Sequence, residues 1–198
     1  MELFYPGNDL LYALAEFLDI KDLNALSQTC KSFVPAKHIK YVFNIVGISI
    51  FLGYTFKYVK RFYLNEERIV YLEPLANLTK LTHLDLNHNR ITNLTPIANL
   101  TKLTHLDLGY NQITDLSPLT NLTNLSYLDL CRNKIVNLTT LANLENLIEL
   151  YLDNNRIVDV KPLSNLTKLK ELSLWGNRIM DYTPLSRLSN CSIAEWKN

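Results

Sequence analysis

The chain lacks the short motifs on which most enzyme families depend. Only five of its 198 residues are glycine, and no phosphate-binding loop is formed from them. It contains no C-x-x-C pair, no H-E-x-x-H zinc motif and no nucleophile elbow. These absences predict a protein that is not an enzyme and that has no catalytic residue, no metal site and no cofactor.

The chain also has few cysteines and almost no net charge. The three cysteines, Cys30, Cys131 and Cys191, lie far apart, and the formal net charge is +1. An odd number of cysteines without a signal peptide indicates a reducing compartment, so we predict the cytoplasm. A nearly neutral chain has no bulk electrostatic preference for nucleic acid, and we expect none as a partner.

One 22-residue unit repeats through most of the chain. Its first leucine recurs at Leu78, Leu100, Leu122, Leu144, Leu166 and Leu188. The alternation of Leu84 and Leu86 within the unit predicts a short strand with both leucines on one face. The spacing shows no insertion or deletion from Phe56 onward. It therefore predicts identical coils that stack in parallel around one apolar core.

An asparagine occupies the same position in five successive units. These residues are Asn89, Asn111, Asn133, Asn155 and Asn177. The chain must turn sharply after each strand, which leaves backbone N–H and C=O groups inside the coil. A buried amide can satisfy such groups in its own turn and in the next. We therefore predict a structural asparagine ladder rather than a row of ligands.

Proline recurs at another position of the unit: Pro74, Pro96, Pro118, Pro162 and Pro184. The one exception is Thr140. Its fixed φ suits the start of a helical turn. A unit this short predicts 3₁₀ or extended outer segments. The pattern resembles leucine-rich-repeat proteins, specifically the short repeats of internalins and of the phosphatase-regulating family. The resemblance implies an α/β fold over residues 56–198, a right-handed solenoid with a parallel concave sheet.

Both ends of the repeat array depart from the pattern. One unit before Leu78 the apolar positions persist, but Glu67 replaces the asparagine. At the other end three residues fall at leucine positions: Cys191, Ala194 and Trp196. Terminal repeats usually differ because they close the core. We therefore expect degenerate first and last repeats, with Trp196 covering the last coil.

Residues 1–40 lie outside the repeat and contain two stripes with helical spacing, separated by a break at Asp22. The string F-L-D-I-K-D-L at residues 17–23 resembles the Y-L-D-x-x-D-L of the F-box family. The string T-C-K-S-F at residues 29–33 resembles its V-C-K-x-W. Pro6 and Asp9 depart from the family's L-P-x-E start.

The F-box resemblance implies a helical domain that docks on the small adaptor of a cullin-type ubiquitin ligase. The implied adaptor-binding residues are Leu10, Leu11, Leu14, Phe17, Leu18 and Leu23. The residues alone leave an alternative, in which the two helices only cap the solenoid. An F-box followed by leucine-rich repeats resembles proteins of large DNA viruses of amoebae as well as eukaryotic receptors. A viral source would imply the host cytoplasm as the location.

Residues 41–55 form an uncharged run between these two parts. A membrane-spanning helix needs about 20 apolar residues. This run is shorter and is interrupted by Asn44, Gly47, Ser49 and Gly53. We predict a buried connector that covers the N-terminal end of the solenoid, rather than a membrane-associated segment.

The residues between the strand leucines are expected on the concave face of the sheet. Aromatic residues flanked by charge are typical of protein-binding hot spots. The predicted target-binding residues are His83, His105, Tyr127, Glu149, Tyr151, Glu171 and Trp175. The aspartates of the L-D-L motif are common filler of such repeats and are not included.

Two further patterns admit a binding interpretation and a structural one. A mostly basic row beside the ladder is either a phosphate-binding strip or a solvated edge: Arg68, Arg90, Gln112, Lys134, Arg156 and Arg178. His83 and His105 lie one turn apart beside Asp85 and Asp107, an arrangement that suits a metal ion. Repetition of filler explains it equally, and we predict no metal there.

Together these features predict a protein–protein interaction module. The first hypothesis is a substrate receptor of a cullin-type ubiquitin ligase, with the adaptor on the F-box and the target on the concave face. The second is an F-box-independent scaffold, similar to the phosphatase-regulating proteins. The third is a secreted internalin-like adhesin, against which the missing signal peptide argues.

Overall fold

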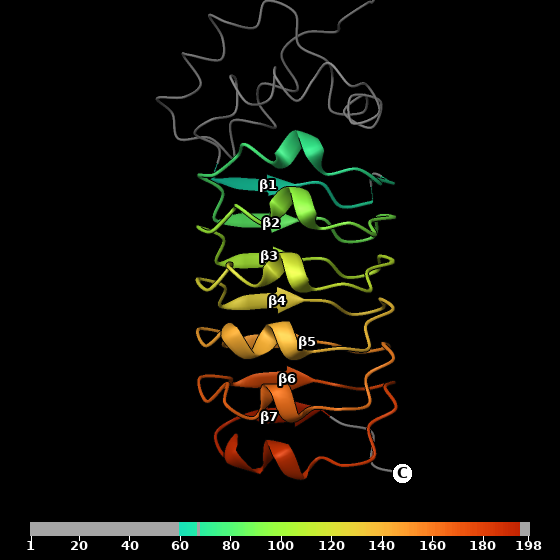
Figure 1. The fold of residues 1–198 in the computed structure, drawn as a ribbon, viewed down its shortest axis with the longest axis vertical. Helices are drawn as coiled ribbons and strands as arrows, with labels where there is room; N and C mark the ends of the chain where they lie inside the picture. Colours follow the sequence, from blue (N-terminus) through green and yellow to red (C-terminus); the bar gives the residue numbers. More distant parts are fainter. Residues whose placement is uncertain (1–59, 67, 195–198) are drawn as a thin grey trace, which may run out of the picture.

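The computed structural model describes residues 60–66 and 68–194, and these form a stack of coils along one long axis (Figure 1). Each coil contributes one three-residue strand to a single parallel sheet, in chain order. The strands are β1 (Arg61–Tyr63), β2 (His83–Asp85), β3 (His105–Asp107), β4 (Tyr127–Asp129), β5 (Glu149–Tyr151), β6 (Glu171–Ser173) and β7 (Ser192–Ala194). The predicted parallel solenoid is confirmed.

The other side of each coil is a 3₁₀ turn, as the short unit predicted. Figure 1 shows these turns as a second file in front of the strands. They are η1 (Glu73–Leu75), η2 (Thr95–Ile97), η3 (Ser117–Leu119), η4 (Thr139–Asn143), η5 (Lys161–Leu163) and η6 (Thr183–Arg187). Proline lies at the first or second position of every turn except η4, where the chain has Thr140. The fixed φ of proline favours the start of five of the six turns, and η4 begins at the equivalent position without it.

The core lies between the sheet and the 3₁₀ turns. Its leucines and isoleucines superpose from one coil to the next because the strands pair with a constant register, for example Leu84 with Leu106 and Leu106 with Leu128. The side chains of Leu106 and Leu128 are completely buried. Truncation of such a side chain removes contacts in two neighbouring coils as well as its own.

The register changes at the last strand, and here the sequence-based prediction was wrong. A strict 22-residue spacing pairs Leu172 with Ala194, but the sheet pairs Leu172 with Ile193. The last coil is thus one residue shorter, and Ala194 is exposed. A branched apolar side chain fills the leucine position better than a methyl group, so the shift places Ile193 against the core. Trp196 lies outside the described residues.

Asparagine amides satisfy the backbone inside each coil. Asn111 donates to the carbonyl oxygens of Leu108 and Gly109 in its own turn, both at 3.0 Å. It also donates to Leu86 O at 3.0 Å and accepts from Ile91 N at 2.9 Å. The second coil it contacts is therefore the preceding one rather than the following one. Equivalent bonds are made by Asn89, Asn133 and Asn155, which are buried, and by Asn177, which is half-buried.

Several predictions lie outside the described residues. These are the F-box-like segment 1–40, the connector 41–55 and Glu67. Within the part of the chain that the structure describes, no helix is both long and apolar enough to cross a bilayer.

Candidate functional site

The candidate site is the exposed face of the parallel sheet, here called the sheet face. Strand geometry points alternate side chains away from the core, so each coil contributes two outward residues from its strand and one just after it. The first file along the face is Arg61, His83, His105, Tyr127, Glu149 and Glu171. The second file is Tyr63, Asp85, Asp107, Asp129, Tyr151 and Ser173, and the third is Asn65, Asn87, Gly109, Cys131, Asp153 and Trp175. All seven predicted target-binding residues therefore lie on this face.

Rings from four successive strands contact one another along the face. His83 and His105 stack with their centroids 4.1 Å apart and their planes 9° apart. His105 and Tyr127 stack at 5.9 Å, and Tyr127 lies against Tyr151 at 5.7 Å in a tilted arrangement. The register of the sheet places His83, His105 and Tyr127 side by side. Tyr151 pairs with Asp129, so its ring contacts Tyr127 diagonally. The four rings form a preorganised aromatic surface.

Two threonines orient the histidines. Thr82 Oγ1 lies 3.0 Å from Lys60 O and 3.0 Å from His83 Nδ1. Thr104 Oγ1 lies 3.1 Å from Thr82 O and 2.9 Å from His105 Nδ1. The hydrogen bond to Nδ1 fixes the orientation of each ring on the face.

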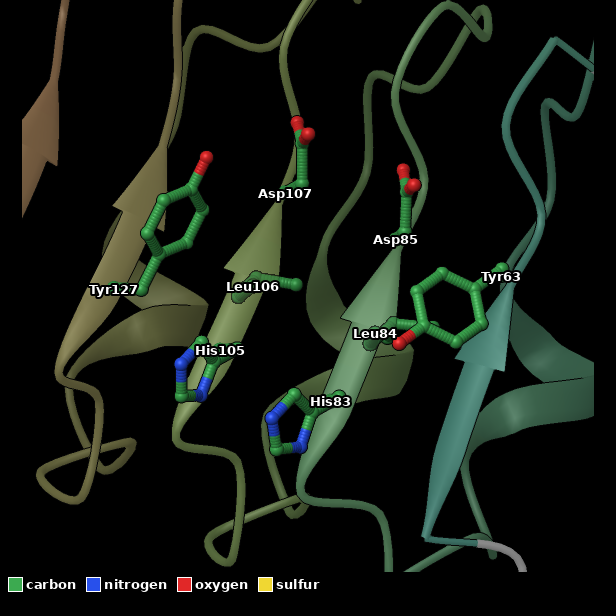
Figure 2. Close-up of a pocket in the computed structure, with 8 residues that line it drawn as sticks. All are labelled: Tyr63, His83, Leu84, Asp85, His105, Leu106, Asp107 and Tyr127. Carbon is green, nitrogen blue, oxygen red and sulfur yellow. The ribbon is translucent and has the colours of Figure 1, made fainter. Parts of the chain in front are cut away.

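A shallow depression lies between these rings and the aspartates (Figure 2). Its walls come from β1 to β4: Tyr63, His83, Asp85, His105, Asp107 and Tyr127, with Leu84 and Leu106 also lining it. Figure 2 shows the histidines at the start of their strands and the aspartates at the end. The depression encloses about 240 Å³, less than the ~300–1,000 Å³ of pockets that bury a small molecule. Its size suits one side chain of a protein partner.

The aspartates of the second file stabilise the turns that follow the strands. Asp85 Oδ1 accepts from Asn87 N at 2.9 Å, Asp107 Oδ1 from Gly109 N at 2.9 Å, and Asp129 Oδ1 from Cys131 N at 2.7 Å. Asn87 Nδ2 also donates to Asp107 Oδ1 at 2.9 Å, which links two coils. These bonds give the L-D-L aspartates a structural role, and each keeps a second carboxylate oxygen on the face.

Burial and neighbouring carboxylates raise the pKa of several groups on the sheet face. Burial, and then the charge of Asp107, raise the pKa of Asp129, although the backbone bond from Cys131 opposes the rise. Burial likewise raises the pKa of Asp85. Burial, followed by the charge of Asp129, raises the pKa of Tyr127. The face is therefore an environment in which negative charge is crowded.

Tyr151 bridges two glutamates on neighbouring strands. Its hydroxyl group lies 2.7 Å from Glu171 Oε2 and 3.2 Å from Glu149 Oε2. Glu149 and Glu171 pair directly in the register of β5 and β6, so the sheet holds two carboxylates side by side. The bond to Glu171 is the main reason why the pKa of Tyr151 is raised. We call Glu149, Tyr151 and Glu171 the acidic bridge.

The C-terminal end of the third file is organised around Asp153. Ser173 replaces aspartate in β6, and Asp153 Oδ1 from the preceding coil instead accepts from Trp175 N at 2.8 Å and from Ser173 Oγ at 2.5 Å. Cys131 Sγ donates to Asp153 Oδ2 at 3.2 Å. Burial, and then the negative charge of Asp129 and the bond to Asp153, raise the pKa of the Cys131 thiol, which makes it a poor nucleophile. Trp175 is 42% exposed at this end of the face.

A second line of side chains, absent from the sequence-based prediction, follows the turn beyond the third file. His88 and Tyr110 stack at 3.8 Å, and Arg132 lies over the Tyr110 ring at 5.0 Å. Each of these three residues has a positive φ, between 53° and 54°. A sequence signal existed, because the next two residues at this position are Asn154 and Gly176, types that favour the left-handed region.

The remaining sequence-based site predictions have different outcomes. The basic row has exposed side chains, as both a phosphate-binding strip and a solvated edge would have: Arg68, Arg90, Gln112, Lys134, Arg156 and Arg178. Over residues 60–66 and 68–194, no group of three or more His, Cys, Asp or Glu side chains is arranged to hold a metal ion. The adaptor-binding residues, from Leu10 to Leu23, lie outside the described residues.

Comparison with protein families identifies the repeat. The family described as "Leucine Rich repeats (2 copies)" matches residues 101–143 and 145–190, and the family described as "Leucine rich repeat" matches residues 57–113. A comparison with curated proteins finds no match. The matched segments extend through the described coils.

Solved structures give the same result. An internalin C2 from Listeria monocytogenes is 38% identical, with a TM-score of 0.63, over 73% of this chain and 74% of that one. An internalin, InlF, from the same organism is 37% identical, with a TM-score of 0.68, over 74% of this chain and 44% of that one. The ectodomain of the Arabidopsis thaliana receptor kinase GASSHO1/SCHENGEN3, in complex with Casparian strip integrity factor 2, is 25% identical with a TM-score of 0.64, over 73% of this chain and 19% of that one.

The sheet and the aromatic face define a protein-interaction module. The chain belongs to the leucine-rich-repeat family, and its coils are similar to those of internalins. It spans less than half of the InlF structure and about three quarters of the internalin C2 structure.

Proposed function

We propose that the sheet face binds a protein target and that residues 1–40 deliver this target to a cullin-type ubiquitin ligase. The observation that supports target binding is the line of contacting rings from His83 to Tyr151 on a rigid sheet. Rigid aromatic side chains bury a large area at a small entropic cost, so they supply most of the affinity in many protein interfaces.

The ligase part of the proposal depends on the F-box resemblance of residues 1–40 and on their position directly before the repeats. The chain has no enzyme motif of its own, so a receptor of this kind would act by bringing the target close to a ligase. In this arrangement the two halves have separate tasks. The adaptor binds the implied residues Leu10, Leu11, Leu14, Phe17, Leu18 and Leu23, and the target binds the sheet face.

Target binding is tested by affinity capture with the full chain from a eukaryotic cell extract. The sheet-face variant Tyr127→Ala/Trp175→Ala is compared with Val136→Ala/Val158→Ala, which truncates two exposed side chains outside the sheet face. We expect proteins that are retained by the parent and by the control but lost from the sheet-face variant. Identical retention by all three proteins would contradict the proposal.

Adaptor binding is tested separately with the purified adaptor subunit of a cullin-type ligase. Leu14→Glu/Phe17→Glu should abolish co-elution with the adaptor in size-exclusion chromatography, because it places charge in the implied docking stripe. Val158→Glu on the repeats is the matched control and should co-elute like the parent. Circular dichroism confirms that each variant is folded. No co-elution of the parent would leave target binding in place and remove the ligase role.

A second candidate is an F-box-independent scaffold. The identity of 37–38% to two internalins over about three quarters of this chain favours it, because the leucine-rich-repeat families match residues 57–143 and 145–190. This function predicts that target capture continues when the adaptor is absent and when Leu14 and Phe17 are replaced. It also predicts that the parent protein does not bind the adaptor.

A further inference from the structure

We propose that the sheet face binds an extended protein segment in which an apolar side chain and a lysine or arginine lie about four residues apart. The apolar side chain occupies the depression over β2 and β3, and the basic side chain binds the acidic bridge on β5 and β6. This inference rests on the proposed target binding by the sheet face and specifies the chemistry of the target.

The polar atoms on this face are predominantly hydrogen-bond acceptors. The carboxylates of the second file accept backbone N–H groups through one oxygen and retain the other. The Tyr151 hydroxyl, which is a donor, is already bonded to Glu171. A partner must therefore supply donors, and lysine and arginine side chains carry only donors.

Charge points to the same partner. None of the outward residues of β2 to β6 is lysine or arginine, whereas five of them are Asp or Glu: Asp85, Asp107, Asp129, Glu149 and Glu171. The net charge of the whole chain is only +1, so negative charge is concentrated on this face. Such a local field favours cationic segments and speeds their association.

The acidic bridge is the strongest candidate for a cation. Glu149 and Glu171 lie directly opposite each other in neighbouring strands, where like charges are destabilising. Tyr151 bonds to both carboxylates but supplies one proton and no charge. An ammonium or guanidinium group would supply several donors and would neutralise the pair. The Tyr151 ring adds a flat surface on which a guanidinium group can stack.

The depression supplies the apolar half of the recognition. It is bordered by the rings of Tyr63, Tyr127 and the stacked histidines, with buried leucines beneath (Figure 2). At about 240 Å³ it accommodates a side chain rather than a whole ligand. An aromatic or large aliphatic side chain would contact these rings, with Asp85 and Asp107 on the remaining border, and contacts between aromatic rings are favourable.

The spacing of the strands sets the distance between the two halves. The midpoint of β2 and β3 is three strands from the midpoint of β5 and β6. Parallel strands lie about 4.8 Å apart, which gives roughly 14 Å between the two subsites. An extended chain advances about 3.3 Å per residue, so roughly four residues cover this distance. The segment therefore crosses the strands and runs along the axis of the solenoid.

The test is selection of a displayed library of random peptides on the full chain at neutral pH. We expect the selected peptides to contain an aromatic or large aliphatic residue with lysine or arginine three to five positions away. Their affinity is then measured for three variants. Glu149→Gln/Glu171→Gln should weaken binding by roughly fivefold, because two charge contacts at the protein surface are lost. Tyr127→Ala should weaken it by at least roughly fivefold, because it truncates an aromatic anchor.

The matched control is Glu73→Gln/Glu145→Gln, which removes two exposed carboxylates outside the sheet face and should leave affinity unchanged. Glutamine preserves the shape of glutamate, so the double variant on the bridge retains the fold. One outcome would overturn this inference and leave target binding intact. In it, the selected peptides lack a basic residue, lose affinity for Tyr127→Ala and bind Glu149→Gln/Glu171→Gln as well as they bind the parent. Peptides that bind all variants equally, or no selected peptides, would overturn the inference, and the extract experiment would then decide target binding on its own.

Discussion

At the scale of the single residue, one amide side chain can determine whether a coil closes. Asn133 is buried and donates to Leu108 O, Leu130 O and Cys131 O, and its Oδ1 accepts from Ile113 N. Asn133→Ala would leave the buried N–H of Ile113 without a partner, at a cost of about 1–3 kcal/mol before local rearrangement. The three carbonyl oxygens would each lose one of two bonds, because Asn111, Asn155 and Tyr110 N still donate to them. We expect a loss of about 3 kcal/mol in the free energy of unfolding, measured by denaturant titration of the full chain.

Asn177→Ala is the internal control for this prediction. Asn177 makes similar bonds to Leu152 O and Leu174 O, but it is only half-buried, so water can replace part of what is lost. Its replacement should cost about 1 kcal/mol. Equal losses at both positions would show that burial does not determine the importance of the ladder amide.

His83 makes the stability of the fold depend on pH. Burial, and then the charges of His105 and Arg61, lower the pKa of His83 below its ordinary 6.5. A base with a lowered pKa binds fewer protons when folded, so the free energy of unfolding decreases as the pH falls through 6.5 and recovers above it. His83→Gln removes this dependence. Denaturant titrations should show the variant within about 0.5 kcal/mol of the parent at about pH 8 and more stable than the parent at about pH 5. The opposite order at acidic pH would contradict the assignment.

At the scale of the element, the parallel register stacks like charges. Asp107 and Asp129 pair directly in β3 and β4. Burial and the charge of Asp107 raise the pKa of Asp129, so the charged carboxylate lowers the free energy of unfolding at neutral pH. This cost disappears below pH 3.8, where the carboxyl group is protonated in the folded and the unfolded protein. Asp129→Asn keeps an oxygen for Cys131 N. We expect a gain of up to about 1 kcal/mol at neutral pH.

Acid titration of the same variant is the check on this interpretation. The gain from Asp129→Asn should decline as the pH falls through the raised pKa and should be absent below 3.8. Glu145→Gln, an exposed carboxylate away from the sheet, should show no gain at any pH. A constant gain at all pH values would indicate a packing effect rather than relief of charge.

The sequence predicted the strands, the 3₁₀ turns and the outward files because each depends on a pattern within one coil. Leu84 and Leu86 establish the strand period, and the proline positions mark the turns. The register of β7 could not be obtained in this way. It depends on whether Ile193 or Ala194 fills the space beside Leu172, which is a comparison of packing in two coils.

The side-chain contacts of the site were also beyond the repeat pattern. The position of Tyr151 on the face followed from spacing, but its bonds to Glu149 and Glu171 require the neighbouring strands to be in place. Asp153 accepts the hydrogen bond from the amide of Trp175 in the following coil, because Ser173 has no carboxylate that could accept it. Both features arise where a coil departs from the consensus, and such departures are where a repeat protein acquires its specificity.

At the scale of the whole molecule, the structure is a one-dimensional array. Strand contacts run only from each coil to the next, in the order β1 to β7. The stability of such an array is a sum of coil terms and of interfaces between neighbours. A binding segment that spans β1 to β6 would therefore link several coils and would be expected to suppress local opening along the whole face.

The position of a core leucine in this array should determine how many coils its truncation destabilises. Leu128 is completely buried between β3 and β5, whereas Leu188 lies in the last 3₁₀ region and is 5% exposed. Leu128→Ala should cost about 2–5 kcal/mol and should increase amide hydrogen exchange in β3, β4 and β5. Leu188→Ala should cost less, because Leu188 is already 5% exposed and, among the described residues, its coil contacts a neighbour on one side only. It should increase exchange in η6 and β7 while leaving β2 to β4 unchanged. Faster exchange along the entire sheet in both variants would mean that the coils unfold as one unit, in conflict with an array of nearest-neighbour contacts.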